Sequence, residues 1–200
     1  MPTPANTTLS MAERLDPTVH AAIARSVASL SHASALMAAS DWALHLAASP
    51  GKCMDLAHLA LRQGQELAAY AQARMAAGPD KKSRHAVATP AQDRRFADPA
   101  WQQWPFNLMH QSFVLTEQWW AAATHGVWGV DKHHEDMVAF AARQFLDVFS
   151  PGNQLATNPV VLNRTLAQGG ANLARGALHL LDDARRHAAG MPPAGAENFV

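Results

Sequence analysis

The side chains that could act as nucleophiles are not set in a sequence context that activates them. A strained elbow, Gly-x-Ser-x-Gly or Gly-x-Cys-x-Gly, would place a nucleophile at a sharp strand-to-helix turn. Neither pattern occurs in the 200 residues. The single cysteine, Cys53, follows Lys52 near an expected helix start. Because the glycine flanks of an elbow and a strand before it are missing, we interpret Cys53 as a small, partly buried side chain. The sequence therefore offers no catalytic residue.

Eleven histidines raise the question of a metal site. His133 and His134 are adjacent and precede Glu135. Neighbouring residues on a helix point about 100° apart, so this pair cannot bind one metal ion from one helix. The other histidines lack ligand spacing, and we interpret them as surface or hydrogen-bonded structural residues. The sequence predicts no metal site and no cofactor site.

Aromatic residues are concentrated between Phe96 and Trp128, a window that holds five of the six tryptophans. Tryptophan clusters usually form a core, and they also anchor protein interfaces and the boundary between water and an apolar phase. We expect core packing first and contact with another domain or an apolar phase second. The candidate interaction surface consists of Phe106, Phe113, Trp119 and Trp120.

Charge and composition argue against several classes of partner. Lys plus Arg number 16 and Asp plus Glu number 16, so no net field attracts nucleic acid or an anionic membrane. The first ten residues lack the basic region and apolar core of an export signal, and no stretch has the roughly eighteen apolar residues of a membrane span. A lone cysteine cannot form an internal disulfide. The expected location is the cytoplasm.

The elements that position these residues are expected to be amphipathic helices, which predicts an all-α fold without strands. The apolar periodicity predicts helices that start at Asp16, run through 36–47, and cover about 51–77, 105–124, 132–149 and 158–190. On the last of these, Gly170 and Ala177 lie within a leucine stripe and indicate the close approach of a neighbouring helix.

The order of the segments predicts three regions. Residues 1–79 form a helical preface, residues 80–92 form a flexible linker that is basic, polar and aperiodic, and residues 93–200 form a helical body. In the body, Asp98-Pro99 and Asn158-Pro159 each pair a capping side chain with proline at the first helical position. Arg94 and Arg95 are expected to form structural ion pairs with acidic side chains.

The body carries, in order, the segments Asp93–Trp101, Trp101-Gln-Gln with Pro105-Phe106, Arg143–Asp147, Ser150–Asn153, Thr157–Pro159 and Leu166–Arg175. In their order and spacing these segments resemble the N-terminal region of the poly(3-hydroxyalkanoate) synthases, which polymerise hydroxyacyl-CoA into storage polyester. The preface around 40–52 is similar to an extra N-terminal segment of some polyhydroxybutyrate polymerases. The resemblance spans roughly residues 16 to 190, with Trp104 and Gly152 departing from the common Asn and Ser.

The resemblance implies that the chemistry lies in a following α/β-hydrolase domain with a Cys nucleophile, an Asp and a His, and none of these maps onto a residue here. The chain is then expected to support polymerisation without catalysing it, through domain bracing, contacts with a second synthase copy, or contacts with polyester granules and granule-associated proteins. The alternative is a stand-alone helical protein that binds polymer granules.

We predict that the purified chain releases no CoA from 3-hydroxybutyryl-CoA, because it offers no activated nucleophile with a base. A thiol assay for free CoA checks this. CoA release that Cys53→Ala abolishes would contradict the prediction.

Overall fold

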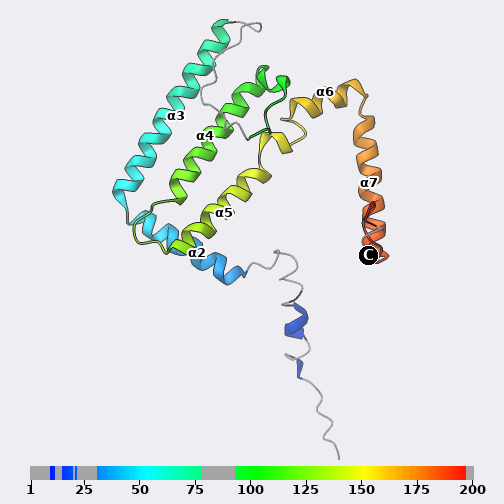
Figure 1. Ribbon diagram of the computed structural model, residues 1–200, viewed down its shortest axis with the longest axis horizontal. Coiled ribbons are helices and arrows are strands. Elements are labelled where there is room, and N and C mark those ends of the chain that lie inside the picture. The colour runs from blue at the N-terminus through cyan, green and yellow to red at the C-terminus, as the bar shows by residue number, and fades with distance from the viewer. Residues whose placement is uncertain (1–9, 12–14, 20, 22–30, 78–92, 197–200) are drawn as a thin grey trace, which may run out of the picture. The chain divides into compact units, whose positions relative to one another are not determined.

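The computed structural model describes residues 10–11, 15–19, 21, 31–77 and 93–196 (Figure 1). In this part of the chain the regular elements are helices and no strand occurs, which confirms the expected all-α fold. None of the described helices is long and apolar enough to cross a membrane. The elements are α2 (His32–Ala47), α3 (Pro50–Ala77), η1 (Pro99–Gln102), α4 (Phe106–Thr124), α5 (Lys132–Val148), η2 (Pro151–Asn153), α6 (Pro159–Ala167) and α7 (Ala171–Ala188), where η denotes a 3₁₀ helix.

The expected caps are present, and they fix where the body elements begin. The Asp98 carboxylate accepts a hydrogen bond from the Ala100 backbone N–H at 2.8 Å and starts η1. The Asn158 side chain accepts from the Val160 and Val161 N–H groups at 3.0 and 3.1 Å and starts α6. Each cap satisfies backbone donors that have no partner within the helix.

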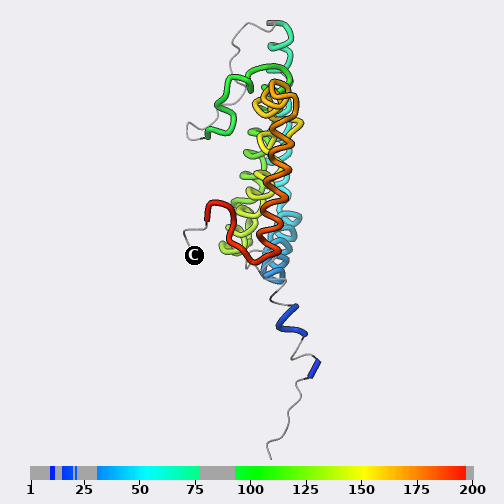
Figure 2. The backbone as a smooth tube through the Cα atoms, turned by 90° about the vertical axis from the view of Figure 1, so that its right-hand side faces the viewer, coloured from blue at the N-terminus to red at the C-terminus, as the bar shows by residue number. Residues whose placement is uncertain are grey.

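The expected single helix from Asn158 to Gly190 is wrong, because it is divided into α6 and α7 at Gly169 and Gly170. Both glycines have positive φ, 56° and 83°, a conformation that only glycine adopts without strain. Both views show the chain turning sharply between α6 and α7 (Figure 1, Figure 2). The expected close approach at Gly170 is also wrong, since no atom lies within 4 Å of a Cβ built there.

The chain forms two compact units, and α3, α4 and α5 each contribute residues to both. Unit 1 contains residues 1–59 and 119–144, and unit 2 contains residues 60–118 and 145–200. Within unit 1, α2 and the start of α3 lie with the end of α4 and most of α5. Unit 2 holds η1, η2, α6, α7 and the aromatic core.

In unit 1, two tryptophans connect segments from either side of the expected linker. The Trp42 indole N–H donates to the carbonyl oxygen of Ala123 at 3.0 Å, and the Trp119 indole N–H donates to that of Leu56 at 3.1 Å. The rings of Trp42 and Trp120 lie 6.4 Å apart. The region before the linker is therefore bonded to α4.

Two expectations concern residues outside the described part of the chain. The linker at 80–92 is one, and its boundaries stay predictions. The other is the first helix, expected to start at Asp16, of which 15–19 are helical, whereas residues 22–30 lie outside the described part of the chain.

Limited proteolysis is predicted to cut first between Gly78 and Gln92, because that sequence has no apolar periodicity to fix it. The two pieces should stay together under native conditions, since Trp42 and Trp119 both bond across the cut. Gel electrophoresis with size-exclusion chromatography checks both parts.

The matched control replaces Trp42 and Trp119 with phenylalanine, which keeps two rings and removes both indole donors, and the cleaved pieces should then separate more readily. Cleavage elsewhere in the body while residues 78–92 stay protected would show that the boundary is misplaced.

Candidate functional site

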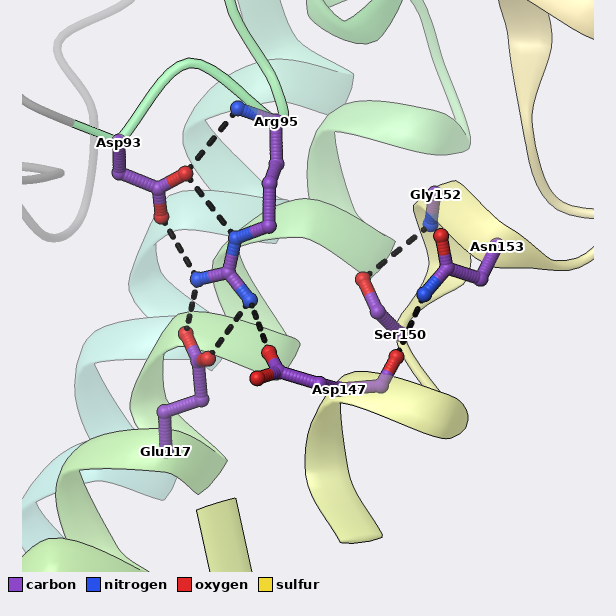
Figure 3. A network of polar contacts seen from close by, with 7 residues as sticks. All are labelled: Asp93, Arg95, Glu117, Asp147, Ser150, Gly152 and Asn153. Carbon is purple, nitrogen blue, oxygen red and sulfur yellow. Dashed lines mark hydrogen bonds and ion pairs between the residues drawn. The ribbon is translucent and has the colours of Figure 1, made fainter. Parts of the chain in front are cut away.

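A tight turn at the start of the body is closed by one side-chain pair. The Asp93 carboxylate accepts hydrogen bonds from the Arg95 backbone N–H and from its Nε, both at 3.0 Å. It also accepts from a terminal guanidinium nitrogen at 2.7 Å. Figure 3 shows this fork-to-fork arrangement. The planar guanidinium suits it because Arg presents its donors in a fixed geometry.

The same guanidinium reaches two helices of unit 2. It donates to both carboxylate oxygens of Glu117 on α4, at 2.8 and 2.9 Å, and to Asp147 on α5 at 3.0 Å (Figure 3). The expected structural ion pair is confirmed for Arg95. Hydrogen bonds from Arg95 hold the pKa of the Asp93 carboxyl below its usual range, and the carboxylates raise the pKa of Arg95 further.

An aromatic core lies against this network. The guanidinium carbon of Arg95 is 5.5 Å from the ring centroid of Phe96 and 5.4 Å from that of Phe113. Phe96 meets Trp101 edge to face at 4.8 Å, and Phe106 and Leu146 pack against the cluster. Trp101 is 1% exposed and Phe113 is 8% exposed. The ion pairs of Arg95 and the burial of the aromatic rings therefore hold together the same three segments of unit 2, which are the turn at 93–96, α4 and α5.

The segment after α5 is held by side-chain bonds to backbone carbonyls. Asn153 donates to the carbonyl oxygen of Asp147 and Asn158 to that of Gly152, both at 2.6 Å. The Ser150 hydroxyl accepts from the Gly152 N–H at 3.4 Å (Figure 3). A Cβ at Gly152 would meet its nearest atoms at 3.7 to 4.0 Å, which is ordinary van der Waals contact, so this position does not require glycine for lack of space. The Ser150–Asn153 and Thr157–Pro159 motifs thus have a structural role.

The four candidate surface residues are placed in two different units. Phe106 and Phe113 are core residues of unit 2, in line with core packing as the first expectation, and Phe113 presents little surface. Trp119 and Trp120 are half-buried in unit 1. Their role as an interaction surface stays a prediction. The sequence analysis did not single out Trp128 or the leucines of α7 as candidate surface residues, and the structure leaves them exposed.

Of the adjacent histidines, His134 helps to connect α2 and α5 within unit 1. His134 donates from Nδ1 to the Asp41 carboxylate at 2.8 Å, and the Asp131 N–H donates to the same oxygen at 3.2 Å. His45 lies 3.0 Å from the other Asp41 oxygen. These bonds lower the pKa of Asp41. Among the described residues, no group of three His, Cys, Asp or Glu is placed to hold a metal ion.

Cys53 differs from its expected partial burial, because it is exposed. Its thiol donates to the carbonyl oxygen of Leu46 at 3.3 Å. Position near the start of α3 leaves it at the surface, where it adds nothing to the packing.

Exposed apolar side chains of unit 2 occur on α7 and at the end of α5. One stripe of α7 consists of side chains that are all exposed, and Leu180 is 70% exposed. On the last turn of α5 and just after it, Phe145 and Phe149 are exposed with ring centroids 4.7 Å apart. The α7 stripe is Leu173, Ala177, Leu180, Leu181 and Ala184. Apolar patches of this kind mark interaction sites.

Two protein families match the chain. Residues 92–198 match the family described as the N-terminus of poly-beta-hydroxybutyrate polymerase (PhaC), and residues 10–52 match a family described as poly-beta-hydroxybutyrate polymerase N terminal. The first match covers the turn, the aromatic core and the helices α4 to α7. No solved structure matches the chain.

Curated proteins that are similar to the chain are polymerases of poly(3-hydroxyalkanoate). A poly(3-hydroxyalkanoate) polymerase of Methylorubrum extorquens is 40% identical over 98 residues, which is 48% of this chain and 16% of that protein. A poly(3-hydroxyalkanoate) polymerase subunit PhaC of Rhizobium meliloti is 36% identical over 92 residues, which is 46% of this chain and 15% of that protein. That of Cupriavidus necator is 31% identical over 98 residues, 48% of this chain and 16% of that protein. The matches therefore span about a sixth of these relatives.

Replacing Arg95 with methionine is predicted to lower the free energy of unfolding by about 1–3 kcal/mol, because three carboxylates lose their shared donor. Arg94→Met is the matched control, with an expected change within about 0.5 kcal/mol. Urea unfolding at pH 7 measures both.

The pH dependence has a defined sign. The lowered pKa of Asp93 stabilises the folded state fully above the ordinary value of about 3.9, and this contribution is lost as the pH falls through the folded-state pKa. Wild type should therefore lose more stability than Arg95→Met between pH 5 and about pH 3. Equal losses of stability in the two proteins would show that the Asp93–Arg95 ion pair is not the source of the pH dependence.

Proposed function

Because the chain belongs to the family formed by the N-terminus of poly-beta-hydroxybutyrate polymerase, we propose that it is the non-catalytic N-terminal region of a polyhydroxyalkanoate synthase. In this proposal it works in the cytoplasm and supports the polymerisation of 3-hydroxyacyl-CoA into storage polyester. The relatives it matches are far longer than the matched segment. The chemical step, transfer of the hydroxyacyl group with release of CoA, belongs to another domain.

The observation that carries the proposal is the exposed stripe of α7. A stripe of three leucines and two alanines on one helical face forgoes burial unless another surface covers it. Burying one leucine contributes about 1.5–3 kcal/mol, so covering this stripe can support a stable contact. We infer that the covering surface is the catalytic domain of the synthase, which this region would then brace.

The charges around the stripe favour a protein partner over a polymer surface. Helices that lie on an apolar phase or an anionic layer carry mainly Lys and Arg on their polar face. On α7 both signs occur, with Asp182 and Asp183 beside Arg185 and Arg186. Asp182 and Arg186 form an ion pair at 3.1 Å. Mixed charges of this kind can select a complementary charge pattern on a protein.

The polar network around Arg95 supports this role indirectly. A docking helix works only if its attachment to the body is rigid. Bonds from Asn153 and Asn158 hold the segment between α5 and α6. The Asn172 and Arg175 side chains of α7 donate to Thr165 and Gln168 at the end of α6. Granules and granule-associated proteins are the other partners expected for this region. Their contacts would use the same exposed apolar surface, so the binding experiment must include them.

We predict that Leu180→Glu combined with Leu173→Glu weakens binding of the chain to the catalytic domain of a polyhydroxyalkanoate synthase by at least about tenfold, because two charges would be buried in the contact. Calorimetry with the two purified proteins measures it.

His179→Glu is the control, since it adds one negative charge on the opposite face of α7 and should leave binding intact. The same three proteins are also incubated with purified polyester granules. Binding to granules alone, with no binding to the catalytic domain, would replace the bracing role by granule attachment.

A further inference from the structure

A shallow hollow of about 650 Å³ lies within unit 1, where its lining residues come from α2 and from the chain around the start of α5. Small-molecule sites of roughly 300–1,000 Å³ enclose most of their ligand. This hollow is open to solvent, so it suits a side chain that projects from another protein better than a small molecule enclosed on all sides. The residues that line it decide which side chain fits.

The apolar wall of the hollow faces solvent. Leu36 and Met37 follow each other on α2 and are 68% and 63% exposed. Burying one such side chain completely contributes about 1.5–3 kcal/mol. Ser40, further along the same helix, adds a hydroxyl group to the lining. An occupant that covers this wall therefore needs an apolar portion of its own.

The Asp131 carboxylate, which also lines the hollow, has one oxygen available for a partner. Its Oδ1 caps α5 and accepts from the His133 and His134 backbone N–H groups at 2.9 and 3.4 Å. From the part of the chain that the structure describes, Oδ2 accepts no hydrogen bond. An ionised carboxylate only accepts hydrogen bonds, so Oδ2 calls for a donor on the occupant.

Asp41 adds negative charge to the hollow, although both of its oxygens are already bonded to other groups of unit 1, as described above. The hydrogen bonds from His134 and from the Asp131 N–H lower the pKa of Asp41, so its carboxylate is ionised at neutral pH. Among the described lining residues there is no lysine or arginine. The hollow thus combines two anions with an apolar wall and has no cation of its own.

This combination disfavours a purely apolar occupant such as a polyester surface. Covering the hollow with such a surface would take two carboxylates out of water without giving them a donor, which costs free energy. A cation with an apolar stem avoids this cost, because it covers the wall and pairs with the charge.

We propose that the hollow receives an arginine side chain of a partner protein. The stem of arginine can cover Leu36 and Met37, and its guanidinium has several donors for Asp131 and Ser40. The guanidinium is more weakly hydrated than the lysine ammonium, so an apolar wall favours it. Arginine is also enriched at protein interfaces. This contact goes beyond the proposed function and is separate from the α7 stripe, which belongs to unit 2.

The first test is NMR of the 200-residue chain with ¹³C-labelled methionine methyl groups, titrated with N-acetyl-arginine amide at pH 7. The Met37 resonance, identified with Met37→Leu, should shift until it saturates. Met54 is exposed in unit 1 but does not line the hollow, so its resonance should stay unchanged. N-acetyl-citrulline amide is the matched ligand, since a neutral urea group of similar shape replaces the guanidinium, and it should give no shift.

Variants of the hollow give the second test. Asp131→Asn keeps a capping side chain for α5 and removes the charge, so it should raise the dissociation constant about fivefold, which corresponds to about 1 kcal/mol. Ser40→Arg places a guanidinium of the chain itself in the hollow and should abolish binding. Asp55→Asn is the matched control, because Asp55 is an exposed carboxylate of unit 1 outside the hollow. Circular dichroism checks that each variant keeps its helices.

Three results would each overturn the proposal: no saturable shift of Met37, an equal response to the citrulline compound, or unchanged binding by Asp131→Asn. Spermidine is titrated in parallel, and an equal shift of Met37 would show that the hollow attracts any cation, which also overturns the assignment to arginine. The catalytic domain is absent from these measurements, so their failure leaves the α7 docking experiment untouched.

Discussion

The Arg95 guanidinium, shared among the carboxylates of Asp93, Glu117 and Asp147, is the interaction on which the organisation of unit 2 depends. It joins the chain where the body begins to α4 and to α5, and its plane faces Phe96 and Phe113. One cation among three anions leaves unbalanced negative charge, so the arrangement holds only because the guanidinium donates several well-directed hydrogen bonds. The segments that enclose the aromatic core are thereby held in place, and the elements that follow α5 begin from a fixed position.

This dependence explains why the residues that carry the family resemblance are structural. Asp98, Ser150, Asn153 and Asn158 all bond backbone groups, and none is placed as a nucleophile, base or metal ligand. Such bonds satisfy backbone donors and acceptors at the short breaks between helices, where secondary structure provides no partner. The motifs therefore fix the path of the chain before α4 and between α5 and α6, whereas the apolar stripe proposed to contact a partner lies elsewhere, on α7.

Local signals in the sequence predicted the parts of the fold that local chemistry decides. Caps such as Asp98-Pro99 and Asn158-Pro159 placed the starts of η1 and α6 within a residue or two. The break at Gly169-Gly170 was missed because an apolar stripe continues across it, although two successive glycines weaken any helix. The partners of Arg95, 22 and 52 residues away, and the exposure of Trp128 depend on tertiary packing that no local pattern encodes.

The glycine pair between α6 and α7 has a consequence for how this region can vary. The positive φ of both glycines sets the direction in which the chain leaves α6, and bonds from the Asn172 and Arg175 side chains of α7 to Thr165 and Gln168 hold that direction. An alanine at Gly169 or Gly170 would strain a positive φ and could re-aim the leucine stripe while every residue of that stripe stays unchanged. Such a substitution would alter partner choice at a distance from the contact, and its genetic suppressors would be expected on the partner's surface.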